Sequence, residues 1–152
     1  MTSKFRTSIV IPSYCSWATL PNVLDALGDQ LGSGREVILV DSSPDAESRL
    51  QTAVERWPWL TAVALDERTS PGKARNLGAN RAQGELLAFL DADAMPEPGW
   101  LAGLEQALGP EHNVVAGAVA NGTPQSPVGT AGYLLEFSAW LPGGRALASR
   151  SR

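Results

Sequence analysis

Two aspartates separated by one residue, Asp91 and Asp93, follow an apolar run in the middle of the chain. If the backbone stays extended there, both carboxylates point to one side while Ala92 points away. Two carboxylates with no thiol or imidazole beside them suit a hard cation such as Mg²⁺ or Mn²⁺, shared with the phosphates of a substrate. Alternatively, the aspartates stabilise the following turn, because Asp is a preferred turn residue. The spacing alone leaves both interpretations open.

Other charged residues stand at positions that favour ligand binding. Asp41 follows the apolar run 36–40 and either caps the next helix or accepts hydrogen bonds from a ligand; Ser43 and Pro44 already provide a helix opening, which leaves Asp41 free. Lys73 and Arg75 fall in the first turn of an expected helix, where backbone N–H groups attract an anion. These two cations either neutralise a diphosphate or belong to a solvated basic face.

The elements that must position these residues alternate in type along the chain. Short β-branched runs predict strands, and apolar residues at helical spacing between them predict helices. The expected strands are 7–11, 36–40, 61–65, 86–90 and 114–119, the expected helices are 20–31, 44–56, 70–83 and 98–108, and a loop is expected over 121–132. This alternation is typical of βαβ units and predicts a three-layer α/β sandwich with a mainly parallel, Rossmann-like sheet.

The strand ends bring the polar residues to one place. In an open parallel sheet, ligands bind beyond the carboxyl ends of the strands. The residues at three of these ends are Pro12, Ser13 and Tyr14, then Asp41, then Asp91 and Asp93. We therefore expect one ligand site at this edge, with Asp41 and Asp91 facing a common cleft.

Composition limits the classes of protein to consider. The chain has 152 residues and a net charge of −4, which argues against a nucleic-acid partner because that would need a basic face. One His and one Cys cannot assemble a zinc site or an intramolecular disulfide, and we interpret His112 and Cys15 as structural. No apolar run approaches the roughly 20 residues of a membrane span, and no signal peptide is evident. A single cytoplasmic domain over 1–152 is expected.

Four blocks of the sequence resemble the family 2 glycosyltransferases of the GT-A fold. They are residues 8–14, 37–43, 72–78 and 84–93, and the last of them ends in an Asp-x-Asp motif. The resemblance implies a GT-A fold, a nucleotide-diphosphate-sugar donor and a divalent cation, Mn²⁺ or Mg²⁺. It further implies transfer of the sugar, with inversion at the anomeric carbon, to the hydroxyl of a glycan, a lipid or another acceptor.

The resemblance also assigns roles to individual residues. Pro12, Ser13 and Tyr14 resemble the segment that lines the base pocket, and Asp41 resembles the carboxylate that contacts the nucleotide base. Asp91 resembles the residue near the ribose and the metal, Asp93 resembles the direct metal ligand, and Arg75 lies in an Ala-Arg-Asn block near the donor. In this comparison Cys15 stands where Asn is common.

The acceptor-binding half of the family has no counterpart in the matched blocks. The carboxylates after Asp93 lie in no matching motif, so the general base is expected beyond residue 152; these carboxylates are Glu97, Glu105, Glu111 and Glu136. The chain is thus expected to be a donor-binding half with little turnover. Its apolar stretch 133–141 is expected to be exposed or to pair with another chain as a homo-oligomer, and a longer form would be compatible with membrane association.

Two other functions compete with this interpretation. A nucleotidyltransferase also combines an α/β sheet with metal-binding carboxylates, but it usually needs a Gly-rich, basic loop after the first strand. Residues 12–17 contain neither Gly nor a basic residue. The alternative from another class is a non-catalytic module that binds a nucleotide sugar.

Overall fold

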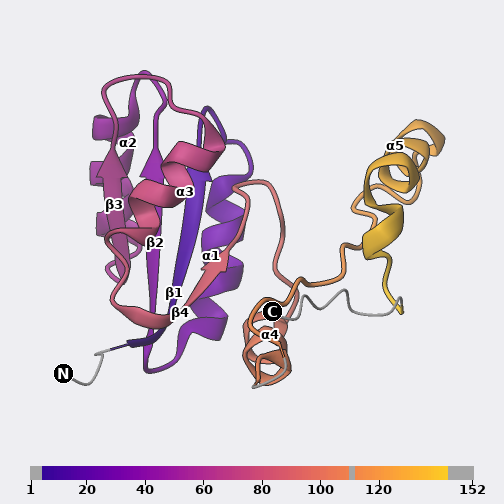
Figure 1. Cartoon of the computed structure of the whole chain (residues 1–152). Coiled ribbons are helices and arrows are strands. Elements are labelled where there is room, and N and C mark those ends of the chain that lie inside the picture. The colour runs from indigo at the N-terminus through magenta and orange to yellow at the C-terminus, as the bar shows by residue number, and fades with distance from the viewer. Residues whose placement is uncertain (1–4, 110–111, 144–152) are drawn as a thin grey trace. The chain divides into compact units, whose positions relative to one another are not determined.

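The structure is a computed structural model, and it describes residues 5–109 and 112–143 (Figure 1). The chain forms two compact units, Met1–Pro98 and Gly99–Arg152. The first unit contains the sheet and all of the site residues predicted from the sequence.

The first unit is built on a parallel sheet of four strands. They are β1 (Phe5–Ser13), β2 (Arg35–Asp41), β3 (Leu60–Ala64) and β4 (Gly84–Phe89), arranged in the order β3-β2-β1-β4. Each neighbouring pair is parallel, with Ser13 opposite Asp41 and Val10 opposite Phe89. The four strands predicted in this part of the chain are confirmed, with bounds that differ by two residues or fewer.

Helices cover both faces of this sheet and make three layers (Figure 1). The chain steps from β1 to β2 to β3 in one direction through α1 (Leu20–Leu31) and α2 (Ala46–Arg56), and returns to β4 through α3 (Pro71–Ala79). Right-handed crossovers therefore place α3 on the opposite face from α1 and α2. Side chains join α1 to α2, since Arg56 pairs with Asp25 at 2.7 Å and the Trp57 indole donates to Asp25 at 2.8 Å. The predicted three-layer sandwich is confirmed.

The central strands are apolar on both sides because both sides are covered. On the α3 side, the buried cluster consists of Val10, Ile38, Val40, Val63 and Ala74. Gly78 sits directly on this cluster: a Cβ there would lie 2.4 Å from Val10 Cγ1. The absence of a side chain at Gly78 thus lets α3 lie close to the sheet, which fixes the position of Arg75 on the same helix.

The third helix is shorter than predicted, ending at Ala79 and not at Gln83. The reason lies in two buried side chains of neighbouring strands. Glu36 accepts the Gln83 backbone N–H at 2.6 Å, and Ser8 Oγ accepts the Gly84 N–H at 2.8 Å. Ser8 in turn donates to Glu36 at 2.5 Å. Because these acceptors take the N–H groups, the chain leaves the helix and enters β4.

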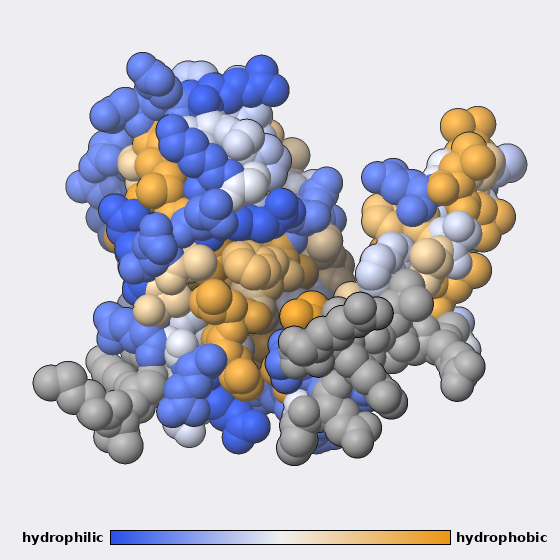
Figure 2. All heavy atoms as spheres, viewed as in Figure 1, coloured by the Kyte–Doolittle hydropathy of each residue, from blue (hydrophilic) through white to orange (hydrophobic). Residues whose placement is uncertain are grey.

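The face of β4 that looks toward the α3 side is left partly uncovered. Leu87 and Phe89 pair in register with Ser8 and Val10, so they point to the same side as Val10. Both are about half exposed, and Figure 2 shows apolar atoms gathered over this strand. The edge strand therefore carries an apolar surface beside its unpaired backbone.

The second unit is helical in its described part. Its elements are α4 (Trp100–Ala107), α5 (Pro127–Phe137) and a 3-10 turn, η1 (Ser138–Trp140). The helix predicted over 98–108 is confirmed by α4. The strand predicted over 114–119 is wrong, because these residues are irregular: Val119 donates its N–H to the Trp140 carbonyl at 2.7 Å, and its own carbonyl accepts from the Tyr133 hydroxyl at 2.6 Å.

The loop predicted over 121–132 also extends too far, because α5 begins at Pro127. Ser126 caps this helix by accepting the Gly129 N–H at 3.0 Å. Within the predicted apolar stretch, Leu134 and Leu135 are exposed, and Figure 2 shows apolar atoms over α5. Pairing with another chain stays a prediction. Among the described residues, none of the helices combines the length and the apolar character that a bilayer span requires.

Candidate functional site

Asp41 ends β2 and is fully buried, with a donor on each carboxylate oxygen. Oδ1 accepts the backbone N–H and the hydroxyl of Ser43, at 2.8 and 2.5 Å. Oδ2 accepts the indole N–H of Trp17 at 2.8 Å. Three donors thus satisfy a buried carboxylate that would otherwise be costly. The alternative role of Asp41 as a cap of the next helix is wrong, because the N-cap residue of α2 is Asp45. Contact of Asp41 with a nucleotide base stays a prediction.

The direction of Asp41 follows from strand geometry. Side chains alternate along a strand, and Val40 faces Gly78 of α3. Asp41 therefore points to the other side, toward the segments that lead into α1 and α2. Trp17 comes from the first of these segments and Ser43 from the second, so two loops meet on one carboxylate.

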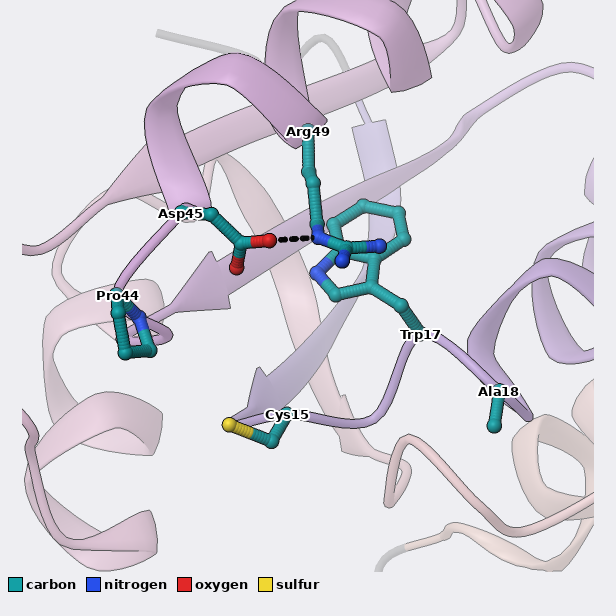
Figure 3. Close-up of a pocket in the computed structure, with 6 residues that line it drawn as sticks. All are labelled: Cys15, Trp17, Ala18, Pro44, Asp45 and Arg49. Atoms are coloured by element: carbon teal, nitrogen blue, oxygen red, sulfur yellow. Dashed lines mark hydrogen bonds and ion pairs between the residues drawn. The ribbon is translucent and has the colours of Figure 1, made fainter.

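An open pocket of about 670 Å³ lies between the same two loops (Figure 3). Its lining residues are Cys15, Trp17, Ala18, Pro44, Asp45 and Arg49. The Arg49 guanidinium lies over the Trp17 ring, 5.8 Å from its centroid, and also pairs with Asp45. The hydrogen bond from Arg49 lowers the pKa of Asp45 below its ordinary value.

Cys15 gives this pocket an unusual backbone at its rim. Its φ of +53° lies in the left-handed region that non-glycine residues seldom adopt. The Cys15 N–H donates to Ser43 Oγ at 2.8 Å, so this conformation joins the first loop to the hydroxyl that also contacts Asp41. Asn tolerates the left-handed region better than Cys.

The α3 side of the edge is richer in cations. Arg75 donates to Asp91 Oδ1 at 2.5 Å, from α3 to the residue two beyond β4. Arg68, in the connection that precedes α3, lies over the Tyr14 ring at 4.6 Å from its centroid. Ser70 caps α3 by accepting the Lys73 N–H at 3.4 Å. Cationic side chains thus accompany both Tyr14 and Asp91.

The Asp-x-Asp segment is a turn, so the condition of an extended backbone, under which both carboxylates would point to one side, is not met there. The Ala94 N–H donates to the Asp91 carbonyl at 3.1 Å. Asp91 and Asp93 are exposed while Ala92 is buried, and the Ala92 carbonyl accepts from Thr19 Oγ1 at 3.0 Å. Thr19 is the N-cap residue of α1, so this turn is held against the start of that helix.

Two exposed carboxylates in one turn fit a divalent cation that takes its other ligands from substrate phosphates and water. Within the described ranges, no three His, Cys, Asp or Glu side chains gather closely enough to hold a metal by themselves. One oxygen of Asp91 already faces Arg75, which would compete with a cation for that oxygen. The donor set fits Mg²⁺ or Mn²⁺ shared with a ligand better than a site closed by protein.

The predicted site residues all lie at the carboxyl edge of the sheet or on the helix beside it. Ser13 is buried and its carbonyl accepts the Ser42 N–H at 3.0 Å, while its hydroxyl has no hydrogen-bond partner among the residues that the structure describes. The pocket of Figure 3 is lined by neither Asp41 nor Asp91. A cleft shared by these two carboxylates stays a prediction.

Sequence reasoning missed the residues that contact the predicted ones. Trp17 and Arg68 come from loops, and no spacing rule links an indole to a carboxylate 24 residues away. Ser43 was interpreted only as part of a helix opening. Arg49 carried a weak signal, because it stands four residues after Asp45 on a helix, a spacing that favours an ion pair.

Comparison with known proteins decides the family. Residues 8–138 match the model of glycosyl transferase family 2. The chain belongs to this family. The matched range covers all four strands except the first three residues of β1.

This family 2 chain is 36% identical over 118 residues to polypeptide N-acetylgalactosaminyltransferase 12 of Mus musculus, covering 72% of this chain and 20% of that protein. It spans 20–31% of the length of this and two further curated relatives. Mannosyltransferase PcManGT from Pyrobaculum calidifontis, solved with GDP-Man and Mn²⁺, superimposes with a TM-score of 0.61 at 26% identity, covering 78% of this chain and 36% of that one. S. aureus TarS 1-349 in complex with UDP gives 0.52 at 26% identity, covering 60% and 28%.

Proposed function

We propose that the chain is the donor-binding part of a metal-dependent, inverting glycosyltransferase, lying within a single GT-A-type domain. Its substrate would be a nucleotide-diphosphate sugar and its acceptor a hydroxyl. The observation that carries this proposal is the carboxyl edge of the sheet, where segments matched to the family place a buried carboxylate, Asp41, and a turn with two exposed carboxylates, Asp91 and Asp93. The GDP-Man, Mn²⁺ and UDP bound in the two similar structures support the ligand class.

Different residues are assigned to different parts of the donor. We assign Pro12, Ser13, Tyr14 and Asp41 to the nucleoside and Arg75 to the diphosphate, because a guanidinium suits phosphate oxygens. Asp91 and Asp93 would hold a Mn²⁺ or Mg²⁺ ion. Such an ion neutralises charge on the departing diphosphate.

The reaction then needs one more group. The acceptor oxygen forms a bond to the anomeric carbon, the bond from that carbon to the diphosphate oxygen breaks, and the nucleoside diphosphate leaves with the electron pair. The acceptor proton must pass to a base on the side opposite the diphosphate. Asp41, Asp91 and Asp93 are committed to nucleoside and metal, so we assign the base to none of them.

Calorimetric titration of UDP and GDP with and without Mn²⁺ tests the donor site. We expect one nucleotide to bind, Mn²⁺ to strengthen its binding, and Asp93→Asn to abolish that strengthening. Asp29→Asn, at an exposed position of α1, is the matched control and should behave as the wild type. Binding that is indifferent to both Mn²⁺ and Asp93→Asn would contradict the metal assignment. Hydrolysis of a donor sugar nucleotide that requires both Mn²⁺ and Asp93 would favour the transferase over the non-catalytic module.

A further inference from the structure

The two oxygens of Asp41 are satisfied in different ways. Oδ1 accepts from Ser43, which is two residues away and held by the turn that follows β2. Oδ2 accepts the indole N–H of Trp17, which belongs to another loop and is only partly buried. Because Trp17 lies outside β2, its indole could leave Oδ2 by giving up this hydrogen bond and its contact with the Arg49 guanidinium, whereas Ser43 is held in the turn.

The charges along this edge of the sheet would favour one orientation of a bound nucleotide. A phosphate next to the buried Asp41 carboxylate would be repelled, while Arg75 stands on the α3 side beside Asp91. If the donor lies across the edge as proposed above, its base therefore falls on the Asp41 side. Trp17 lines the pocket on this side together with Ala18 and Pro44, and it also donates to Asp41, which does not itself line the pocket. Withdrawal of the indole would therefore open this pocket toward Asp41.

The hydrogen-bonding groups of the bases limit which nucleobases could donate to Asp41. Uracil and guanine, the bases of the ligands in the two similar structures, each carry a ring N–H donor on their pairing edge. Cytosine and adenine carry a bare ring nitrogen, an acceptor, at the corresponding place. The Trp17 indole is likewise a flat ring with an N–H donor. It therefore gives Asp41 the same kind of hydrogen bond, from a ring N–H, that uracil or guanine would give.

We propose that Trp17 is an internal substitute for the nucleobase: its indole holds Asp41 Oδ2 in the free protein and gives this oxygen up to a uracil or guanine ring N–H on binding. This inference rests on the proposed function. The exchange keeps a buried carboxylate oxygen paired in both states, which avoids the cost of an unsatisfied buried acceptor. Trp17 is then a specificity-determining residue, since only a base that donates a ring N–H replaces it without loss.

The hydrogen bond between the Trp17 indole and Asp41 also lowers the affinity for the nucleotide. A ligand that must displace a group already in place has an apparent affinity equal to its intrinsic affinity multiplied by the fraction of protein that is already open. The smaller this fraction, the weaker the binding. Removing the indole should therefore tighten the binding of UDP or GDP, because these ligands then restore a missing donor. We expect Trp17→Phe to gain about tenfold or more in affinity for the preferred nucleotide and to gain nothing for CDP.

The direct test is ¹⁹F NMR of the protein labelled with 5-fluorotryptophan, which reports its five tryptophans separately. Single Trp→Phe variants at the other four positions assign the Trp17 resonance by elimination, so the assignment does not depend on the folding of Trp17→Phe. We expect saturating UDP or GDP to shift the Trp17 resonance and CDP at the same concentration to leave it in place. Trp59→Phe is the matched control for affinity, since Trp59 packs beside Gly28 of α1, and it should bind as the wild type.

The outcomes separate this inference from the function on which it rests. One overturning result is that UDP or GDP saturates the protein while the Trp17 resonance stays in place, and another is that folded Trp17→Phe binds no more tightly than the wild type. Either result would show that the indole does not take the place of the base, and would leave the proposed donor site unaffected. If neither nucleotide binds to the wild type or to Trp17→Phe, with or without Mn²⁺, the proposed function itself fails and Trp17 has no base to replace.

Discussion

Arg75 and Asp91 form an ion pair of 2.5 Å that joins α3 to the turn after β4. Both side chains keep contact with solvent, so the pair itself adds only about 0–1 kcal/mol to the free energy of unfolding. Its position is more informative than its strength, because it places a guanidinium beside the carboxylates assigned to the metal.

The first prediction therefore concerns Arg75→Gln. Loss of the guanidinium should weaken UDP or GDP binding by about 1.5–3 kcal/mol, the range for a hydrogen bond to a charged group. Binding of uridine or guanosine, which have no diphosphate, should stay unchanged. Arg81→Gln, just after α3 at an exposed position, is the control and should affect neither ligand. Equal losses for nucleoside and nucleotide would place Arg75 away from the diphosphate.

The second prediction concerns the strained backbone of Cys15. Its φ of +53° is costly for Cys, and Asn adopts this region more readily. Cys15→Asn should raise the free energy of unfolding by a few tenths to about 1 kcal/mol, measured by urea denaturation. Cys15→Ser is the control, because it changes polarity without the same preference, and it should gain less. Identical stabilities of the two variants would show that the backbone is relaxed at this position.

The third prediction concerns pH at the rim of the pocket. The hydrogen bond from Arg49 lowers the pKa of Asp45, so Arg49→Gln should return this pKa toward its ordinary value of 3.8. The sign follows from linkage: a lowered pKa in the folded state stabilises the fold above the unfolded value, and this stabilisation is lost as the pH falls through the lowered value. The carboxyl ¹³C resonance of Asp45 reports the titration. Arg56→Gln, which removes the pair with Asp25, should leave the Asp45 curve in place.

The strands of residues 5–98 could be predicted from the sequence because the local hydrophobic pattern and the tertiary contacts agree there. Runs such as 37–40 are apolar on both faces, and helices cover both faces of β2. The end of α3 did not follow, since it depends on Glu36 and Ser8, which come from strands far away in the sequence. The strand predicted over 114–119 had the right composition, but Val119 pairs with Trp140 and Tyr133 instead of a neighbouring strand.

The candidate site divides in the same way. The strand-end rule located Asp41, Asp91 and Asp93, because the ends of parallel strands must meet at one edge. Partners supplied by loops, above all Trp17, depend on how two loops close over the edge, which no local pattern encodes. A signal for α5 was overlooked: Ser126 and Pro127 repeat the opening that had predicted the start of α3 at Ser70 and Pro71.

The last prediction concerns the close approach of α3 to the sheet. In Gly78→Ala the new Cβ would lie 2.4 Å from Val10 Cγ1, so either the helix or the valine must move. Overpacking of this kind costs about 1–3 kcal/mol of unfolding free energy, measurable by urea denaturation. Because Arg75 lies on the same helix, its displacement should also weaken nucleoside diphosphate binding while leaving nucleoside binding unchanged.

Two further variants make this prediction specific. Gly72→Ala changes the same residue type on the same helix, but its new Cβ meets nothing within 4 Å, so it should be neutral or stabilising. Val10→Ala removes the methyl groups that the Gly78→Ala side chain would strike. The double variant should therefore be more stable than the sum of the two single losses indicates, by about 0.5–3 kcal/mol. Strict additivity, together with unchanged nucleoside diphosphate binding, would mean that the new Cβ does not press on Val10 and that Gly78 does not set the position of Arg75.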